Sequence, residues 1–128
     1  MILGAALVEL RVHASQSLKQ KRGVVQSVKR RVRNRFNLSV AEVGGQDTWQ
    51  RAVIALAAAG SSERIVRAEL ERALAYIEEL HLAEVAGAEL QIVELPEEEA
   101  GLADPDDEDL DDDAFDDDAR DEDGEDDA

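Results

Sequence analysis

The side chains best able to do chemistry in this sequence are basic, and they gather in one segment of the chain. Nine Lys and Arg residues fall between Leu10 and Ala41, and no Asp or Glu interrupts them. At about 100° per residue, six polar side chains of this segment lie in one strip along a predicted helix. The strip consists of Lys19, Arg22, Gln26, Lys29, Arg30 and Arg33, and Arg35 follows it at the end of the helix.

The strip is about 20 Å long at 1.5 Å per residue, which is enough to contact several phosphates of a polyanion. A solvated helix face is the alternative interpretation. Such a face usually mixes charges of both signs at i,i+4 spacing, whereas like charges at this spacing destabilise an isolated helix. Because the strip contains no acidic residue, the pattern favours anion binding over a bland surface.

A second group of side chains lies between two predicted strands, in the segment Gln46-Asp47-Thr48-Trp49-Gln50-Arg51. The indole of Trp49 could stack on a base or a ribose, while Gln50 and Arg51 contact the nucleic-acid backbone. In the structural interpretation, Asp47 caps the turn and Trp49 packs over a sheet edge or a dimer partner. The sequence leaves both interpretations open.

The sequence offers no set of residues for catalysis. It contains no Cys, so thiolate chemistry and zinc ribbons are excluded. Neither His13 nor His81 has a metal-ligand neighbour at helical or loop spacing, and no glycine-rich phosphate loop follows the first strand. We therefore predict a protein that is not an enzyme, with no catalytic residues, metal site, cofactor or evident small-molecule substrate.

Hydrophobic periodicity predicts the elements that hold these groups. Their order is that of a ferredoxin-like βαββαβ fold of the α+β class, a four-stranded antiparallel sheet with two helices on one face. The first and third strands are the least charged and are expected at the centre of the sheet. The expected elements are strand Ile2–Val12, helix Leu18–Arg35, strand Leu38–Val43, strand Arg51–Ala59, a helix opening at Ser61–Glu63 and strand Val85–Leu95.

The expected central strands contain no aromatic residue, so the sheet is not predicted to stack bases as an RRM does. Any contact with RNA is expected to run through the basic helix, which would recognise phosphates and shape rather than base sequence.

Charge divides the chain into two parts. Residues 1–95 carry 13 Lys and Arg against 11 Asp and Glu, whereas residues 96–128 carry 1 against 20. We expect a folded domain over 1–95 and a disordered acidic tail over 96–128. The tail either raises solubility or competes for the basic helix as an autoinhibitor. With no signal peptide and no apolar run of 18 residues, a cytoplasmic protein with no membrane contact is expected.

Several short motifs between Ser17 and Ala52 resemble those of the YlxP-like bacterial family, a domain of unknown function. The motifs are Ser17-Leu18-Lys19, Lys21-Arg22, Arg33-Asn34-Arg35-Phe36-Asn37, Ser39-Val40-Ala41-Glu42 and Gln46-Asp47 through Trp49-Gln50-Arg51. The resemblance covers residues 1 to about 95 and implies a ferredoxin-like fold in a cytoplasmic bacterial protein. It also implies genes close to those of a translation initiation factor and a ribosome-binding factor. The chain departs from the pattern at Gly23, where a basic residue is commoner, and in its acidic tail.

Two functional hypotheses follow. In the first, the protein is a non-enzymatic accessory factor that binds structured RNA or the ribosome through the strip and the turn, with the tail as an autoinhibitor. In the second, it is a homodimeric protein-interaction module without direct RNA contact. Strand Leu38–Val43 and Trp49 then form the dimer, and the basic helix docks an acidic protein.

Overall fold

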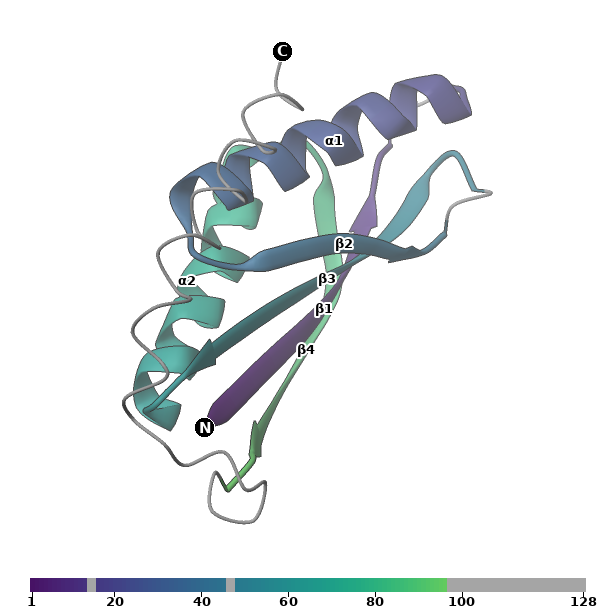
Figure 1. The fold of residues 1–128 in the computed structure, drawn as a ribbon. Helices are drawn as coiled ribbons and strands as arrows, with labels where there is room; N and C mark the ends of the chain where they lie inside the picture. The colour runs from purple at the N-terminus through teal and green to yellow at the C-terminus, as the bar shows by residue number, and fades with distance from the viewer. Residues whose placement is uncertain (14–15, 46–47, 97–128) are drawn as a thin grey trace, which may run out of the picture. The chain divides into compact units, whose positions relative to one another are not determined.

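The computed structural model describes residues 1–13, 16–45 and 48–96, and Figure 1 shows its strands and helices. Their order confirms the predicted ferredoxin-like βαββαβ arrangement, and the ends of each strand lie within one residue of the prediction. The elements are β1 (Ile2–Arg11), α1 (Leu18–Arg35), β2 (Ser39–Gly44), β3 (Arg51–Gly60), α2 (Glu63–Leu80) and β4 (Glu84–Glu94). The predicted disorder of the acidic tail and the capping role of Asp47 lie outside the described residues.

The four strands form one antiparallel sheet in the order β2-β3-β1-β4. The strands β1 and β3 are central, as predicted from their low charge, and β2 and β4 are the edges. In the middle of the sheet, Leu7 of β1 lies opposite Ala55 of β3 on one side and Glu89 of β4 on the other. The register shifts at Glu9/Leu10 where β1 pairs with β4, and at Glu42/Gly44 where β2 pairs with β3.

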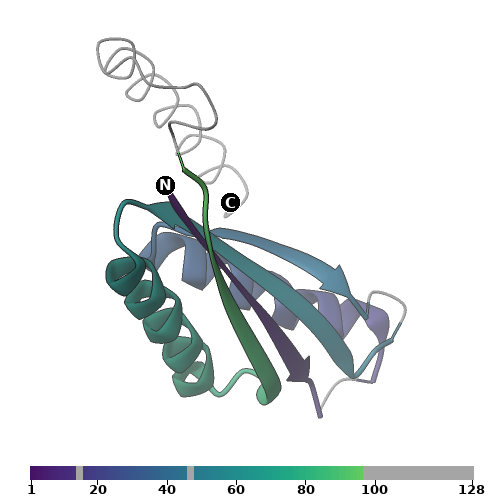
Figure 2. The same ribbon diagram turned by 90° about the horizontal axis from the view of Figure 1, so that it is seen from below.

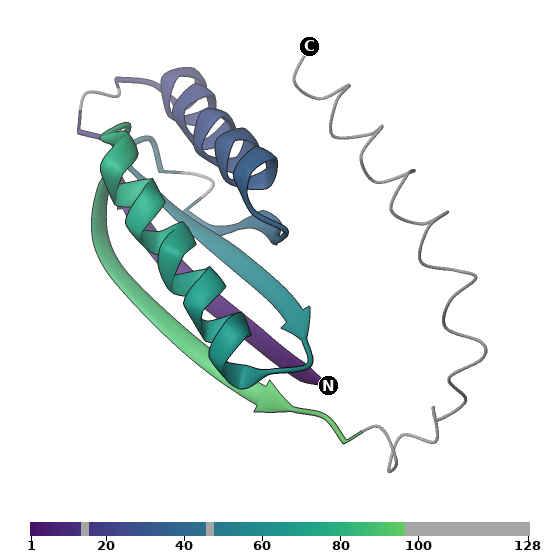
Figure 3. The same cartoon turned by 90° about the vertical axis from the view of Figure 1, so that its left-hand side faces the viewer.

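Both helices pack on the same face of this sheet, which Figure 3 shows from the helix side. Along β1 and β3 the side chains alternate between this covered face and the opposite face, as a strand requires. Each helix buries one apolar stripe against the sheet, and Leu18, Phe36 and Leu74 beside these stripes are half-buried. The buried stripes are Val25, Val28 and Val32 in α1, and Val66, Leu70, Ala73 and Ile77 in α2.

Each helix begins at a serine with extended backbone. Ser17 is the N-cap of α1, and its Oγ accepts a hydrogen bond from the backbone N of Gln20 at 3.1 Å. Ser62 does the same for Ile65 in α2 at 3.4 Å. His81 ends α2 in the left-handed region, with φ of 55°. Among the described residues, no helix is long and apolar enough to cross a membrane.

The close packing of α2 on the sheet depends on Gly4 in β1. A Cβ added at this position would lie 2.6 Å from a methyl of Val66 and 2.7 Å from a methyl of Leu70. Both distances are far below ordinary van der Waals contact, so any larger residue would push the helix away from the centre of the sheet.

Candidate nucleic-acid interface

The polar strip predicted on α1 lies along one side of the helix, beside the buried stripe. We call this surface the basic flank. Its residues range from exposed at the N-terminal end to half-buried at the C-terminal end. Arg33 fixes which side of the molecule it occupies, because its Nη2 donates a hydrogen bond of 2.8 Å to the carbonyl oxygen of Val40 in β2. The basic flank therefore faces the edge strand β2. It consists of Lys19, Arg22, Gln26, Lys29, Arg30 and Arg33.

Arg35 lies on the opposite side of α1 from the basic flank. Its guanidinium carbon lies 4.8 Å from the centroid of the Tyr76 ring in α2. Tyr76 also makes an edge-to-face contact with Phe36, with ring centroids 5.6 Å apart. Two residues along a helix correspond to a rotation of about 200°, so Arg35 cannot share a side with Arg33. The structure thus separates Arg35 from the other candidate residues of the helix.

Lys21 is the one basic residue of α1 that is buried, with its side chain 1% exposed. Its Nζ donates to the carbonyl oxygen of Gly45 at 2.7 Å and to that of Arg51 at 3.4 Å. The carboxylate of Glu42 lies 3.4 Å away and supplies the opposite charge. Because the ammonium of Lys21 has three N–H donors, it can bond both carbonyls at once and so connect the two ends of the turn between β2 and β3.

Sequence reasoning missed the burial of Lys21, although a signal was present. Lys21 precedes Val25, Val28 and Val32 by 4, 7 and 11 residues, which is the spacing of the buried stripe itself. A lysine in such a position is rarely buried without a partner. Glu42 was the second signal: an acidic residue on the covered face of an edge strand is a suitable partner for a buried lysine.

The turn between β2 and β3 presents Trp49 and Gln50 to solvent, and the Trp49 side chain is 51% exposed. Around it, the backbone N of Thr48 donates to Gly45 O at 3.1 Å, and the backbone N of Val12 donates to Gln50 O at 3.0 Å. Together with the bonds from Lys21, these contacts hold the turn next to the N-terminal part of α1. The structure thus brings Trp49 and Gln50 to the end of the helix that carries Lys19 and Arg22.

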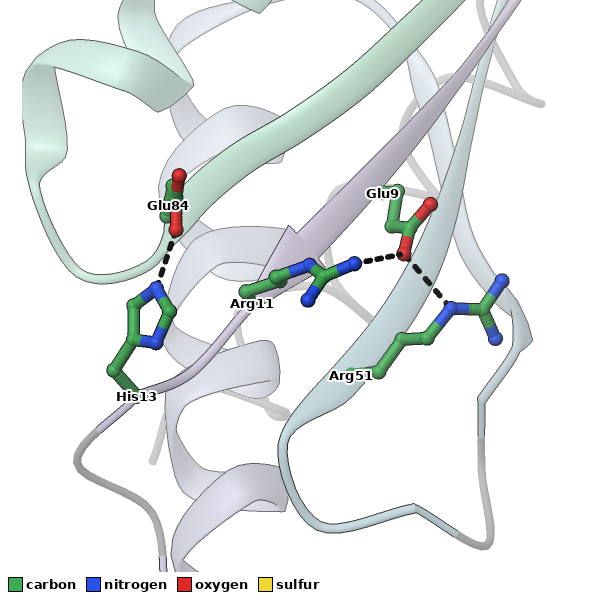
Figure 4. A network of polar contacts seen from close by, with 5 residues as sticks. All are labelled: Glu9, Arg11, His13, Arg51 and Glu84. Carbon is green, nitrogen blue, oxygen red and sulfur yellow. Dashed lines mark hydrogen bonds and ion pairs between the residues drawn. The ribbon is translucent and has the colours of Figure 1, made fainter.

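Arg51 points to the face of the sheet away from the helices. Its neighbour Ala52 is fully buried on the covered face, and side chains alternate along a strand, so Arg51 lies on the open face. There its Nε donates to a carboxylate oxygen of Glu9 at 2.9 Å, and Arg11 approaches the same oxygen at 3.9 Å (Figure 4). The predicted partnership of Arg51 with the basic flank is therefore not seen, because the sheet lies between them.

The same end of the sheet holds a contact between His13 and Glu84, drawn in Figure 4. Both side chains are more than half exposed, with 71% and 57% of their surface accessible. Within the described parts of the chain, no group of three or more His, Asp or Glu is arranged to hold a metal ion. His13 itself lies two residues beyond the end of β1.

Three cations of the basic flank take part in no ion pair among the described residues. Over residues 1–13, 16–45 and 48–96, no ion pair includes Lys19, Arg22 or Lys29. Lys19 lies in the first turn of α1, which contains no acidic residue. The positive end of a helix dipole destabilises a cation there by about 0.3–1 kcal/mol. A bound anion would relieve this cost.

The chain is similar to one known protein family and to one of its relatives. A family model described as a protein of unknown function, DUF503, matches residues 3–90. The chain is also 43% identical to the uncharacterized protein YlxP of Bacillus subtilis (strain 168) over 77 residues, which is 60% of this chain and 84% of that protein. The family match covers both helices and the turn at Trp49, and it confirms the resemblance inferred from the short motifs.

Proposed function

The chain belongs to the DUF503 family of proteins of unknown function, and we propose that it binds structured RNA through the basic flank and the turn at Trp49. The observation that carries the proposal is the charge of α1. This helix has eight basic residues and no acidic residue among its 18 positions. Over the described parts of the chain, the exposed Lys19 and Arg22 and the half-buried Lys29 take part in no ion pair.

The arrangement of the cations on α1 indicates the kind of ligand that the basic flank would bind. A line of separated cations on a rigid helix suits a regular line of phosphates, and release of counterions from those phosphates supplies salt-dependent affinity. The side chains on the open face of β1 and β3 contain no aromatic residue, which disfavours stacking of several bases on the sheet. The proposed binding therefore depends on backbone and shape, with the single exposed indole of Trp49 available for one unpaired base.

The genes implied by the family resemblance, close to those of a translation initiation factor and a ribosome-binding factor, support ribosomal RNA as the ligand class. On this proposal the acidic segment after Pro96, with 20 Asp and Glu, competes with RNA for the basic flank. A competitor joined to the same chain has an effective concentration on the order of mM.

The test compares the two helices by neutralising the same number of charges on each. The variant K19Q/R22Q/K29Q alters the basic flank, and the control R64Q/R67Q/R72Q alters three exposed arginines of α2. Binding to a hairpin RNA is measured by fluorescence anisotropy between about 50 and 200 mM salt. The flank variant should lose about 30-fold or more in affinity and reduce the salt slope by about 2–3, while the control stays within about twofold.

Two results contradict the proposal. The first is a protein ending at Pro96 that shows no measurable RNA affinity at the lowest salt. The second is an equal loss of affinity in both triple variants, which would mean that overall charge, rather than the basic flank, attracts the RNA.

A protein-interaction module is the second candidate, and the exposure of Val43 (50%) and Trp49 (51%) around the end of β2 favours it. A partner strand could pair with the edge strand β2. The hydrogen bond from Arg33 limits such pairing, because it already occupies the carbonyl oxygen of Val40. A pull-down from lysate distinguishes the two candidates. A complex that survives nuclease treatment supports protein interaction, whereas one that is lost supports RNA binding.

A further inference from the structure

The face of the sheet away from the helices is apolar at its centre. The strands β1 and β3 carry apolar side chains on both faces, a pattern typical of strands that are covered on both sides. The helices α1 and α2 cover only one of these faces, as the view in Figure 2 shows. On the other face, Leu3 is 40% exposed, Leu7 46% and Val93 of β4 54%. The apolar centre of this open face consists of Leu3, Ala5, Leu7, Ala55, Ala57 and Ala59.

The charges on the open face lie around this centre. Glu89 and Gln91 border it on β4, opposite Leu7 and Ala5. At one end, Glu9 lies between the guanidinium groups of Arg11 and Arg51. An apolar centre with a polar rim is the usual composition of a protein–protein interface.

The centre of the open face carries an exposed leucine and a hollow. Leu7, 46% exposed, forms part of the wall of a shallow hollow of about 310 Å³, which is also lined by Ala5, Ala6, Ala55, Glu89 and Gln91. A two-fold symmetric contact requires a surface that is complementary to itself. A leucine at the wall of a hollow meets this condition, because each Leu7 can enter the hollow of the other copy next to its Leu7.

We infer that the open face packs against the same face of a second copy of the chain. Strands of 10 residues and four strands spaced about 4.8 Å apart give a face of roughly 33 by 19 Å, or about 600 Å². A standard interface uses about 800 Å² on each partner. The dimer is accordingly small and reversible.

Other occupants fit the open face less well. The segment after Pro96 contains 20 acidic residues and only three large apolar ones, Leu102, Leu110 and Phe115. Covering an apolar face with that segment would take carboxylates out of water at a high cost. RNA is also a poor occupant, because the open face offers no aromatic side chain on which a base could stack. Its two arginines, Arg11 and Arg51, already lie next to the carboxylate of Glu9.

The proposed dimer is independent of the proposed RNA binding and differs from a dimer through β2. Face-to-face packing leaves α1 and α2 on the outside of the dimer, so both basic flanks stay accessible. The outcome for oligomeric state therefore does not decide the outcome for RNA affinity.

Sedimentation velocity of the full-length chain between about 5 and 200 µM tests the inference. The wild type should form a dimer as its concentration rises, and L7E should remain a monomer over the whole range. The control I65E introduces the same charge at an exposed apolar residue of α2, 56% exposed, and should dimerise like the wild type. Circular dichroism and thermal unfolding show whether L7E is folded.

A second measurement does not depend on the folding of L7E. The sequence has no Cys, so a single introduced cysteine reports one position. A short bis-maleimide should cross-link A5C, on the open face, into dimers. The matched variant A75C, on the exposed side of α2, should stay uncross-linked.

Three results would overturn the inference. A full-length wild type that stays monomeric throughout leaves the acidic segment or another protein as the cover of the open face. If L7E and I65E weaken the dimer equally, the contact does not depend on the open face in particular. Loss of the dimer in W49A, with L7E still dimeric, assigns the contact to β2 and the turn.

Discussion

The two helices of this fold have the same length, the same kind of N-cap and the same packing surface, yet opposite patterns of charge. Each has 18 residues, begins after a serine N-cap and covers the same face of the sheet. In α2, five acidic residues accompany three arginines, and Glu63 lies 3.5 Å from Arg67 one turn later. In α1, eight basic residues accompany no acidic residue. The buried stripe determines how a helix packs, and its outer side remains free to carry a function.

The difference also shows which helix is arranged for its own stability. Glu63 in the first turn of α2 interacts favourably with the helix dipole, and the pair with Arg67 adds a few tenths of a kcal/mol. The first turn of α1 carries Lys19 instead, next to the positive end of the dipole. Four predictions test whether this contrast reflects function.

The largest effect is expected from K21M, which keeps the apolar stem of the buried lysine and removes its ammonium. The carbonyls of Gly45 and Arg51 then lose a charged donor, so the free energy of unfolding should fall by about 2–3 kcal/mol. Urea denaturation measures the change, and acrylamide quenching of Trp49 should increase as the turn loosens. The control K19M, two residues earlier and exposed, removes a cation from the positive end of the helix dipole and should raise stability slightly, by about 0.3–1 kcal/mol. An equally stable K21M would show that Lys21 is not needed to hold the turn.

The second prediction concerns the acidic segment. Ending the chain at Pro96 should raise affinity for a hairpin RNA about tenfold at 50 mM salt, equivalent to about 1.4 kcal/mol, because an intramolecular competitor is removed. In the K19Q/R22Q/K29Q background the same deletion should have a smaller effect, since three of the five cations for which the two compete are already removed. Equal affinities of the full-length and shortened proteins would remove autoinhibition and leave the basic flank as a separate question.

Third, Gly23 offers a way to extend the basic flank. A Cβ at this position meets no atom within 4 Å, and replacement of glycine inside a helix should stabilise the protein by about 0.5–1 kcal/mol. The variants G23A and G23K should gain similar stability in thermal unfolding. Only G23K should bind RNA more tightly, by about threefold, with a steeper salt dependence. If G23A and G23K bind equally, a charge beside the flank does not contribute to binding.

The smallest effect is expected from Q20E, which places an acid in the first turn of α1. Its carboxylate should stabilise the helix by about 0.3–1 kcal/mol through the dipole while weakening RNA binding about twofold next to Lys19. The reciprocal change E63Q in α2 should lower stability by a similar amount and leave RNA affinity unchanged. Thermal unfolding and anisotropy on the same samples check both signs, and weaker RNA binding by E63Q would contradict the assignment of the two helices.

The order of the elements, the central and edge strands and the position of the basic flank followed from the sequence by itself. The elements and the basic flank depend on a local repeat, of 2 residues in strands and 3.6 in helices, that any segment displays without its neighbours. The central strands depend on a comparison of charge among the four strands. The same arithmetic placed Lys19, Arg22 and Lys29 on one side of α1. The same helical spacing also places Lys21 on the buried stripe and places Arg35 and Arg33 on different sides of α1.

Only the tertiary structure decided which of these residues act together. Arg51 follows Gln50 directly, yet the sheet places its side chain beside Glu9, away from the basic flank. The burial of Lys21 required Glu42 and two carbonyls from a distant turn, and no local repeat encodes such partners. The open apolar face likewise appears only when β1 and β3 are paired and both helices lie on one side, because exposure is a property of the assembled sheet rather than of any one strand.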